Sequence, residues 1–166
     1  MKRDIRIEVV YPHPPARVWR ALTDSAELAQ WLMQNDFQPR LGHKFQFRTK
    51  PQPGWRGIVD CEVVEIEESR RLAYTWKGEL DRPVTKVTWT LEPIPGGTKL
   101  QLEHTGFQGL GGVMLSMLLG SGWGKMLRKT IPDLLAGAVR EEKGRPMLAY
   151  KRWLGRLGRA LMRKGI

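Results

Sequence analysis

The sequence predicts an α+β fold in which an antiparallel sheet is covered on one face by a single long helix. Three observations support this prediction. Apolar and polar side chains alternate in several short segments, apolar residues recur at helical spacing in two short segments and one long one, and the alternating segments carry bulky apolar residues on one face. Such a sheet face has to be buried, and one amphipathic helix is available to cover it.

The chain begins with a strand and two short helices. Residues 5–11 alternate between apolar and polar side chains, and the Pro-His-Pro-Pro sequence at 12–15 ends the strand. Pro15 suits the first turn of a helix, and the Thr-Asp-Ser sequence at 23–25 ends that helix and caps a second one. The apolar residues share one face in each helix, namely Val18, Trp19 and Leu22 in the first and Leu28, Trp31 and Leu32 in the second.

About five strands follow. Extended structure resumes at Gly42 with Phe45 and Phe47 on one face, and residues 55–66 and 70–77 give two further strands. The last two strands form a hairpin around a turn of Pro and two Gly residues. Their inward residues are bulky and end in an imidazole: Val87, Trp89, Leu91, Leu100, Leu102 and His104. This pattern favours a pocket wall with a single polar group.

The C-terminal part of the chain predicts one long helix. Residues 106–122 are apolar but interrupted by glycines, so we expect a connection there. From about 122 to 142 apolar residues recur at helical spacing, and Pro132 must kink or divide that helix. The longest mostly apolar run, 110–123, is shorter than the ~18 residues that a membrane-spanning helix needs. We therefore expect no transmembrane segment.

Composition and charge divide the chain into two parts. Its 166 residues fit one domain with a core of its own. The single cysteine, Cys61, cannot form an internal disulfide, and the N-terminus lacks the apolar core of a secretory signal, so a cytoplasmic location is expected. Seven Lys or Arg and no acid lie in residues 144–166, out of a net charge of +11. This predicts a domain at 1–143 and a basic tail at 144–166.

An ordered set of segments resembles the START-related helix-grip (SRPBCC) superfamily, and within it the branch of the activator of the heat-shock-protein-90 ATPase. The segments are PPARVWRALTD at 14–24, LAQWL at 28–32, RLGHKFQFR at 40–48, RRLAYTW at 70–76, VTWTLEP, GGTKL and HTGF between 87 and 107, and Gly122-Trp123. None is specific alone, but their order is. The chain departs from the family at Glu68-Ser69, where two prolines are usual, and at Pro132 in the closing helix. It also lacks the asparagine- and tryptophan-rich segment of the eukaryotic co-chaperone.

The resemblance implies a curved antiparallel sheet of six or seven strands that grips the C-terminal helix around a hydrophobic cavity. In that fold Trp76, Trp89 and Trp123 would converge from sheet and helix. The candidate ligand-binding residues are Phe45, Phe47, Tyr74, Trp76, Trp89, Leu102, His104, Trp123 and Leu127. These side chains either fill a core or line a ligand cavity, and the sequence leaves both alternatives open.

Other polar residues give little sign of catalysis. The three histidines are far apart in sequence and have no Cys or carboxylate at metal-ligand spacing, so no metal site is predicted. His13 and His43 adjoin turns and are expected at the surface, whereas His104 is either a hydrogen-bonded core residue or a ligand contact. Cys61 is interpreted as a small buried hydrophobe, and its neighbours Asp60 and Glu62 as solvated charges.

The tail has the pattern of a basic amphipathic helix. Its candidate surface residues are Lys151, Arg152, Trp153, Arg156, Arg159 and Arg163. The apolar face would pack on the domain or on a second copy, or the helix would lie on an anionic membrane. A basic helix does not require nucleic acid to explain it, and we do not expect that partner.

Together these features predict a non-enzymatic protein that binds a small hydrophobic or amphipathic ligand between sheet and helix, without a cofactor. The alternative is a stress-response or chaperone-associated interaction module with a filled core. A cyclase-like or hydratase-like activity would need a pair of polar groups inside the cavity, and only His104 is an evident candidate.

Overall fold

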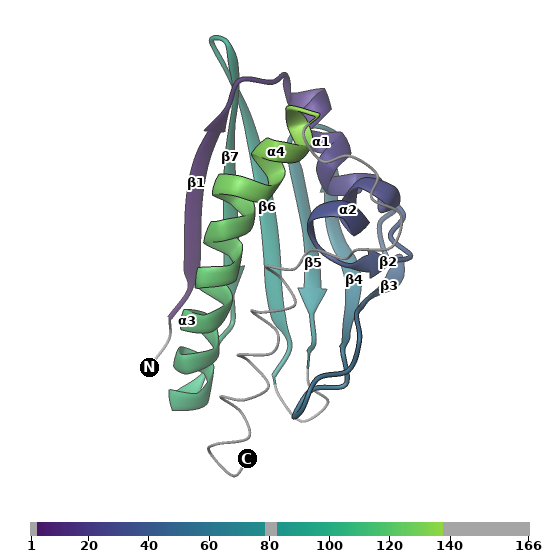
Figure 1. The fold of residues 1–166 in the computed structure, drawn as a ribbon, viewed down its shortest axis with the longest axis vertical. Helices are drawn as coiled ribbons and strands as arrows, with labels where there is room; N and C mark the ends of the chain where they lie inside the picture. The colour runs from purple at the N-terminus through teal and green to yellow at the C-terminus, as the bar shows by residue number, and fades with distance from the viewer. Residues whose placement is uncertain (1–2, 79–82, 138–166) are drawn as a thin grey trace.

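The computed structural model describes residues 3–78 and 83–137, which form one seven-stranded antiparallel sheet with helices on one face (Figure 1). The strand order is β1-β7-β6-β5-β4-β3-β2, so the first and last strands are neighbours. The predicted α+β fold with six or seven strands is therefore confirmed. The strands are β1 (Ile5–Tyr11), β2 (Gln34–Asn35), β3 (Lys44–Arg48), β4 (Ile58–Glu67), β5 (Arg71–Trp76), β6 (Thr85–Ile94) and β7 (Gly97–Thr105).

The two short helices follow β1 as predicted. They are α1 (Pro15–Thr23) and α2 (Ser25–Trp31), and the Asp24 side chain between them accepts a hydrogen bond from the Glu27 backbone N–H at 2.9 Å. The buried Glu27 carboxylate lies 2.8 Å from Arg17 and 2.7 Å from Arg20. These ion pairs join the two helices, since a buried carboxylate needs charged or hydrogen-bonding partners.

The predicted hairpin is formed by β6 and β7, and its predicted inward residues face one another in pairs. Val87 pairs with His104, Trp89 with Leu102 and Leu91 with Leu100, and all six side chains are buried. At this turn the backbone of Gly97 lies close to the end of β1. A Cβ at Gly97 would be only 2.1 Å from the Tyr11 carbonyl oxygen. Only glycine allows that approach between the two backbones.

The start of the long helix was predicted wrongly. The segment 106–122, expected to be a connection, contains most of α3 (Gly109–Lys125), followed by a π-helical segment, η1 (Met126–Thr130), and by α4 (Ile131–Leu135). Glycine disfavours helices, but tertiary packing decides here. A Cβ at Gly120 would contact Ile5 at 3.7 Å, so α3 runs close over β1. Residues 138–142 lie outside the described residues.

Pro132 divides the helix through a change of hydrogen-bond register. The Ile131 N–H bonds to the Met126 carbonyl, five residues back, which is the π-helical pattern. In this register Pro132 would be the partner of the Leu127 carbonyl, but proline has no N–H. The Tyr11 hydroxyl of β1 donates instead to the Leu127 oxygen at 2.5 Å. Burial raises the pKa of Tyr11, so its hydroxyl stays protonated and remains a donor.

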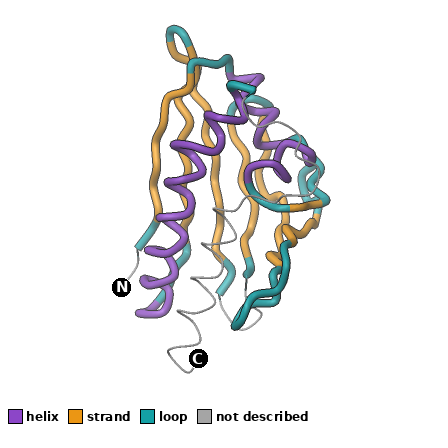
Figure 2. The backbone as a smooth tube through the Cα atoms, viewed as in Figure 1, coloured by secondary structure: helices purple, strands orange, loops and turns teal. Residues whose placement is uncertain are grey.

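The helices form one layer over the sheet (Figure 2). α3 contacts β1, α1 contacts β6 and β7, and α2 contacts the short edge strand β2. The two-residue strand β2 was not predicted, because two residues show no alternation.

In the described part of the chain no helix combines the length and the apolarity needed to cross a membrane. The predicted tail, 144–166, lies outside the described residues.

Candidate ligand-binding site

Three tryptophans converge between sheet and helix, as the resemblance implied. Trp76 ends β5, Trp89 lies in the middle of β6, and Trp123 reaches them from α3. The Trp123 ring centroid is 5.5 Å from that of Trp76 and 5.6 Å from that of Trp89, with interplanar angles of 62° and 82°. These are edge-to-face contacts, each worth roughly 0.5–1.5 kcal/mol beyond area burial.

A second aromatic group adjoins the first. Phe45 and Phe47 of β3 and Tyr74 of β5 pack with centroid distances of 5.3 to 6.1 Å, and Phe47 lies 5.7 Å from Trp76. The remaining predicted residues, Leu102 and Leu127, are fully buried. All nine predicted residues are at most 8% exposed and belong to one core cluster or, for His104, contact it. We call these nine residues the aromatic wall.

His104 is the polar centre of the aromatic wall, and both ring nitrogens have protein partners. The Trp123 indole N–H donates to Nδ1 at 3.1 Å, and Nε2 lies 2.7 Å from the Thr85 hydroxyl. Because that hydroxyl donates to the Trp76 carbonyl at 3.1 Å, Nε2 carries the proton and donates to Thr85. The chain of hydrogen bonds connects α3, β7, β6 and β5.

Electrostatics keep His104 neutral. Burial lowers the pKa of His104 from 6.5 to about 3, because the imidazolium would be desolvated. Tyr74 is also buried, its hydroxyl accepts the Trp89 indole N–H at 3.0 Å, and burial raises its pKa. Neither His104 nor Tyr74 is therefore poised to exchange a proton near neutral pH.

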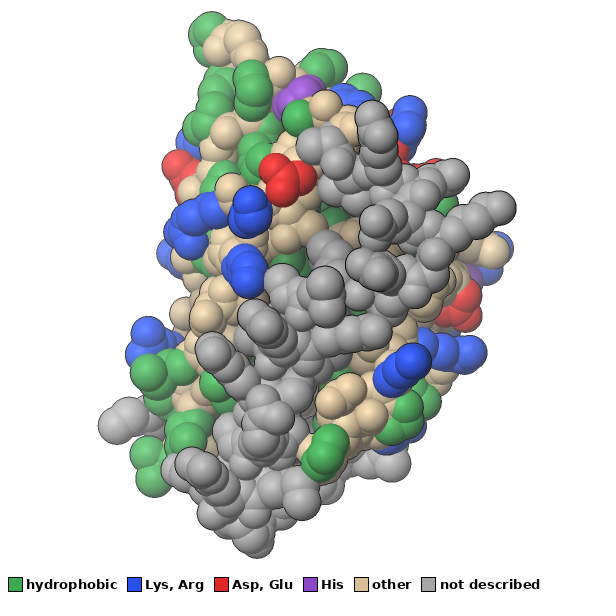
Figure 3. Space-filling model, viewed as in Figure 1, with side chains coloured by type: hydrophobic (Ala, Val, Ile, Leu, Met, Phe, Trp, Pro, Cys, Tyr) green, Lys and Arg blue, Asp and Glu red, His purple; other side chains and the backbone are tan. Residues whose placement is uncertain are grey.

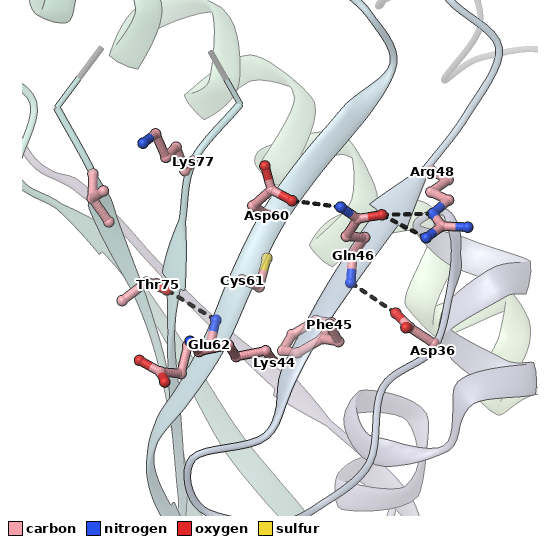
Figure 4. A pocket seen from close by; sticks show the side chains of 11 residues that line it. Asp36, Lys44, Phe45, Gln46, Arg48, Asp60, Cys61, Glu62, Thr75 and Lys77 are labelled. Carbon is pink, nitrogen blue, oxygen red and sulfur yellow. Dashed lines mark hydrogen bonds between the residues drawn. The ribbon is translucent and has the colours of Figure 1, made fainter. Parts of the chain in front are cut away.

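A shallow pocket of about 460 Å³ lies on the opposite, outer face of the sheet (Figure 4). It is lined mainly by polar side chains of β3, β4 and β5, and Phe45, Cys61 and Val84 also contribute to the lining. Gln46 donates to Asp60 at 2.6 Å and accepts from Arg48 at 2.6 and 2.8 Å, while Asp36 accepts from the Gln46 backbone at 2.7 Å. These groups satisfy one another. This pocket was not predicted from the sequence, although the polar positions 44, 46 and 48 were a signal for it.

The remaining polar residues considered in the sequence, namely the cysteine, its acidic neighbours and the other two histidines, contact protein groups or are buried. Cys61 is buried, as interpreted, and burial raises its pKa, with smaller effects of Asp60 and Asp36. Asp60 and Glu62 are half-buried rather than fully solvated, and Asp60 pairs with Arg56 at 2.6 Å. His13 and His43 are half-buried, and His43 contacts the Asp36 carbonyl at 2.9 Å. Among the described residues, no three His, Cys, Asp or Glu side chains are grouped to hold a metal ion.

The predicted surface residues of the tail are Lys151, Arg152, Trp153, Arg156, Arg159 and Arg163, and all lie outside the described residues. The partners suggested for that segment therefore stay predictions.

Solved structures of other proteins are similar to this chain in fold and in sequence. The crystal structure of protein MLL2253 from Mesorhizobium loti is 34% identical, has a TM-score of 0.72, and covers 83% of this chain and 99% of its own. DynU16, a protein of the dynemicin biosynthetic locus, is 26% identical with a TM-score of 0.65, over 86% of this chain and 48% of its own.

A curated relative is much longer than this chain. The pyruvate dehydrogenase E1 component of Haemophilus influenzae is 27% identical over 150 residues, which are 85% of this chain but 17% of that enzyme. The chain thus spans about a sixth of the length of this relative, and the activity for which the relative is named belongs to the longer protein.

The family model that matches is described as activator of Hsp90 ATPase homolog 1-like protein, and it covers residues 12–136. This range runs from the end of β1 to the end of α4 and includes the whole aromatic wall. The chain therefore belongs to the family of activator of Hsp90 ATPase homolog 1-like proteins, within the helix-grip fold.

Proposed function

We propose that this protein binds a small hydrophobic or amphipathic molecule between the concave face of its sheet and α3, and that it does not catalyse a reaction on it. The observation that carries the proposal is the meeting of Trp76, Trp89 and Trp123, of which Trp76 and Trp123 also contact the neutral ring of His104. Aromatic side chains dominate the apolar walls of small-molecule sites, and a few polar groups orient the ligand.

The helix and the sheet each contribute part of the wall, which gives a route for entry. Trp123 comes from α3, whereas its two tryptophan partners come from β5 and β6. α3 also rests on β1 through the close contact between Gly120 and Ile5. Movement of α3 about that contact would part Trp123 from the sheet and admit a flat apolar molecule between the rings.

The chemistry of the wall supports binding without catalysis. His104 is held neutral and spends both nitrogens on protein partners, so proton transfer to a ligand would first break a buried hydrogen bond. A ligand with one donor group can replace the Trp123 indole N–H as the hydrogen-bond donor to His104 Nδ1. The likeness to a protein of a biosynthetic locus supports a small molecule as the ligand.

Native mass spectrometry of the full chain, purified from cells without detergent, tests the proposal. We expect a population heavier than the polypeptide by the mass of a small molecule, which is released into organic solvent. We also expect 1-anilinonaphthalene-8-sulfonate to raise the melting temperature, with a smaller rise in Trp123→Phe than in the control Trp19→Phe on α1. Bare polypeptide mass together with an unchanged melting temperature would contradict the proposal.

A chaperone-associated interaction module is the second candidate. It is favoured by the direct ring-to-ring contacts of the aromatic wall, which are also what a filled core requires. The family description supports it as well. This candidate predicts that the purified chain raises the ATPase rate of an Hsp90-type chaperone and co-elutes with it, and that it carries no bound small molecule.

A further inference from the structure

α3 exposes an apolar stripe on the surface that faces away from the sheet. Leu110, Met114 and Met117 follow the i, i+4, i+7 spacing of one helical face, and their exposed fractions are 74%, 39% and 55%. No charged residue occurs from Gly106 to Gly124. Exposed apolar residues scattered singly are ordinary, but a stripe along one helix marks an interaction site.

The same helical face continues into positive charge. After the exposed Ser121, the next positions on this face are Lys125 and Arg128, both exposed, with the exposed Lys129 beside them. At ~1.5 Å of rise per residue, Lys125 lies about 12 Å beyond Met117 along the axis. Figure 3 shows hydrophobic side chains at the lower end of this face and Lys and Arg side chains above them. Before Asp133 this helical stretch contains no acid.

We propose that this face of α3, defined by Leu110, Met114, Met117, Lys125 and Arg128, docks on an anionic membrane surface. An interfacial helix buries an apolar stripe at the boundary of headgroups and acyl chains, while Lys and Arg contact anionic headgroups. The stripe supplies the apolar half of that interaction and the two cations supply the electrostatic half. The net charge of +11 strengthens attraction of the whole chain to such a surface.

Charge decides between this occupant and a second copy of the chain. Two copies packed through this face in antiparallel fashion would place the cations of one against the apolar stripe of the other, where they would lose water without a partner. An anionic lipid surface offers phosphate groups to the cations and acyl chains to the stripe at the same time. The proposal is independent of the ligand-binding function, because it uses the side of α3 opposite the buried Trp123.

Co-sedimentation of the full chain with vesicles tests the proposal. We expect binding to vesicles of phosphatidylglycerol and phosphatidylcholine, and at least tenfold weaker binding to phosphatidylcholine alone. The double variant L110S/M117S should weaken binding to the anionic vesicles at least tenfold, and K125Q/R128Q should weaken it several-fold. The matched control V10S/L41S replaces two residues of similar exposure, 61% and 64%, on other surfaces and should bind as the unmodified chain does.

Three results would overturn the proposal. One is a failure of the unmodified chain to bind anionic vesicles, and another is equal binding by L110S/M117S, which would assign the membrane affinity to the basic tail. The third is loss of self-association by L110S/M117S in sedimentation velocity without any change in vesicle binding, which would assign the face to a second copy. Circular dichroism and the melting temperature confirm that each variant is folded, and unchanged probe binding separates this test from that of the ligand site.

Discussion

His104 shows how one buried side chain makes stability depend on pH. In the folded state its pKa is about 3, whereas the unfolded chain has the ordinary value of 6.5. Above pH 6.5 the imidazole is neutral in both states and adds no pH dependence. Below pH 6.5 the unfolded chain takes up a proton that the folded chain refuses, so the free energy of unfolding falls by about 1.4 kcal/mol per pH unit down to about pH 3.

The resulting prediction concerns the window between pH 7 and pH 5.5, where carboxylates titrate little. Urea unfolding should show the unmodified chain losing about 1 kcal/mol more over this window than His104→Gln. The amide of Gln is neutral throughout and keeps a donor and an acceptor. Equal losses in the two proteins would mean that His104 is accessible to protons in the folded state.

At the scale of elements, Tyr11 and Pro132 form a unit that joins β1 to the final helix. Proline leaves the Leu127 carbonyl without its helical partner, and the Tyr11 hydroxyl replaces that partner. Tyr11→Phe should therefore lower the free energy of unfolding by about 1–3 kcal/mol, the usual cost of an unsatisfied buried polar group.

A double-mutant cycle tests this unit. In a Pro132→Ala background residue 132 regains an N–H that can donate to the Leu127 carbonyl. In that background, Tyr11→Phe should lower the free energy of unfolding by about 1 kcal/mol less than it does in the unmodified chain. Urea unfolding of the unmodified chain, the two single variants and the double variant measures this difference. Additive effects would show that the hydroxyl and the proline act independently.

The same elements show what the sequence could predict. The β6–β7 hairpin and its inward-facing residues were predicted, because alternation and the turn are local signals, whereas the facing pairs come from the structure. The beginning of α3 was not predicted, because its glycines disfavour a helix and obscure the helical spacing of its buried residues. Ser116, Leu119 and Trp123 are buried at i, i+3 and i+7, which is a helical signal. The π-helical segment has no local signal, since the Tyr11 hydroxyl that sustains it lies 116 residues away from Leu127.

At the scale of the whole molecule, the sheet brings distant side chains to one place. The nine residues of the aromatic wall come from β3, β5, β6, β7, α3 and η1. Strand parity predicted which face the strand residues would occupy, but the convergence of Trp76, Trp89 and Trp123 followed only from the family resemblance. The hydrogen bonds of His104 could not be predicted, because Thr85 and Trp123 are each 19 residues from it along the chain.

The pocket on the outer face of the sheet is a second feature that could not be predicted from the sequence. Gln46, Asp60 and Thr75 belong to three different strands, and their common surface depends on the register of β3, β4 and β5. Alternation shows that such residues point away from the core, but it does not show which of them are neighbours. The fold class could therefore be predicted from local patterns in the sequence. Which side chains are neighbours on each face of the sheet could not, because it depends on how the strands pair.

The indole N–H signals of the tryptophans in a ¹H–¹⁵N NMR spectrum test the central claim most directly. Titration of the full chain with 1-anilinonaphthalene-8-sulfonate should shift the signals of Trp76, Trp89 and Trp123 in a saturable way. The signal of Trp19, outside the aromatic wall, should stay in place. Signals of the three wall tryptophans that do not move at saturating probe would contradict binding between the sheet and α3.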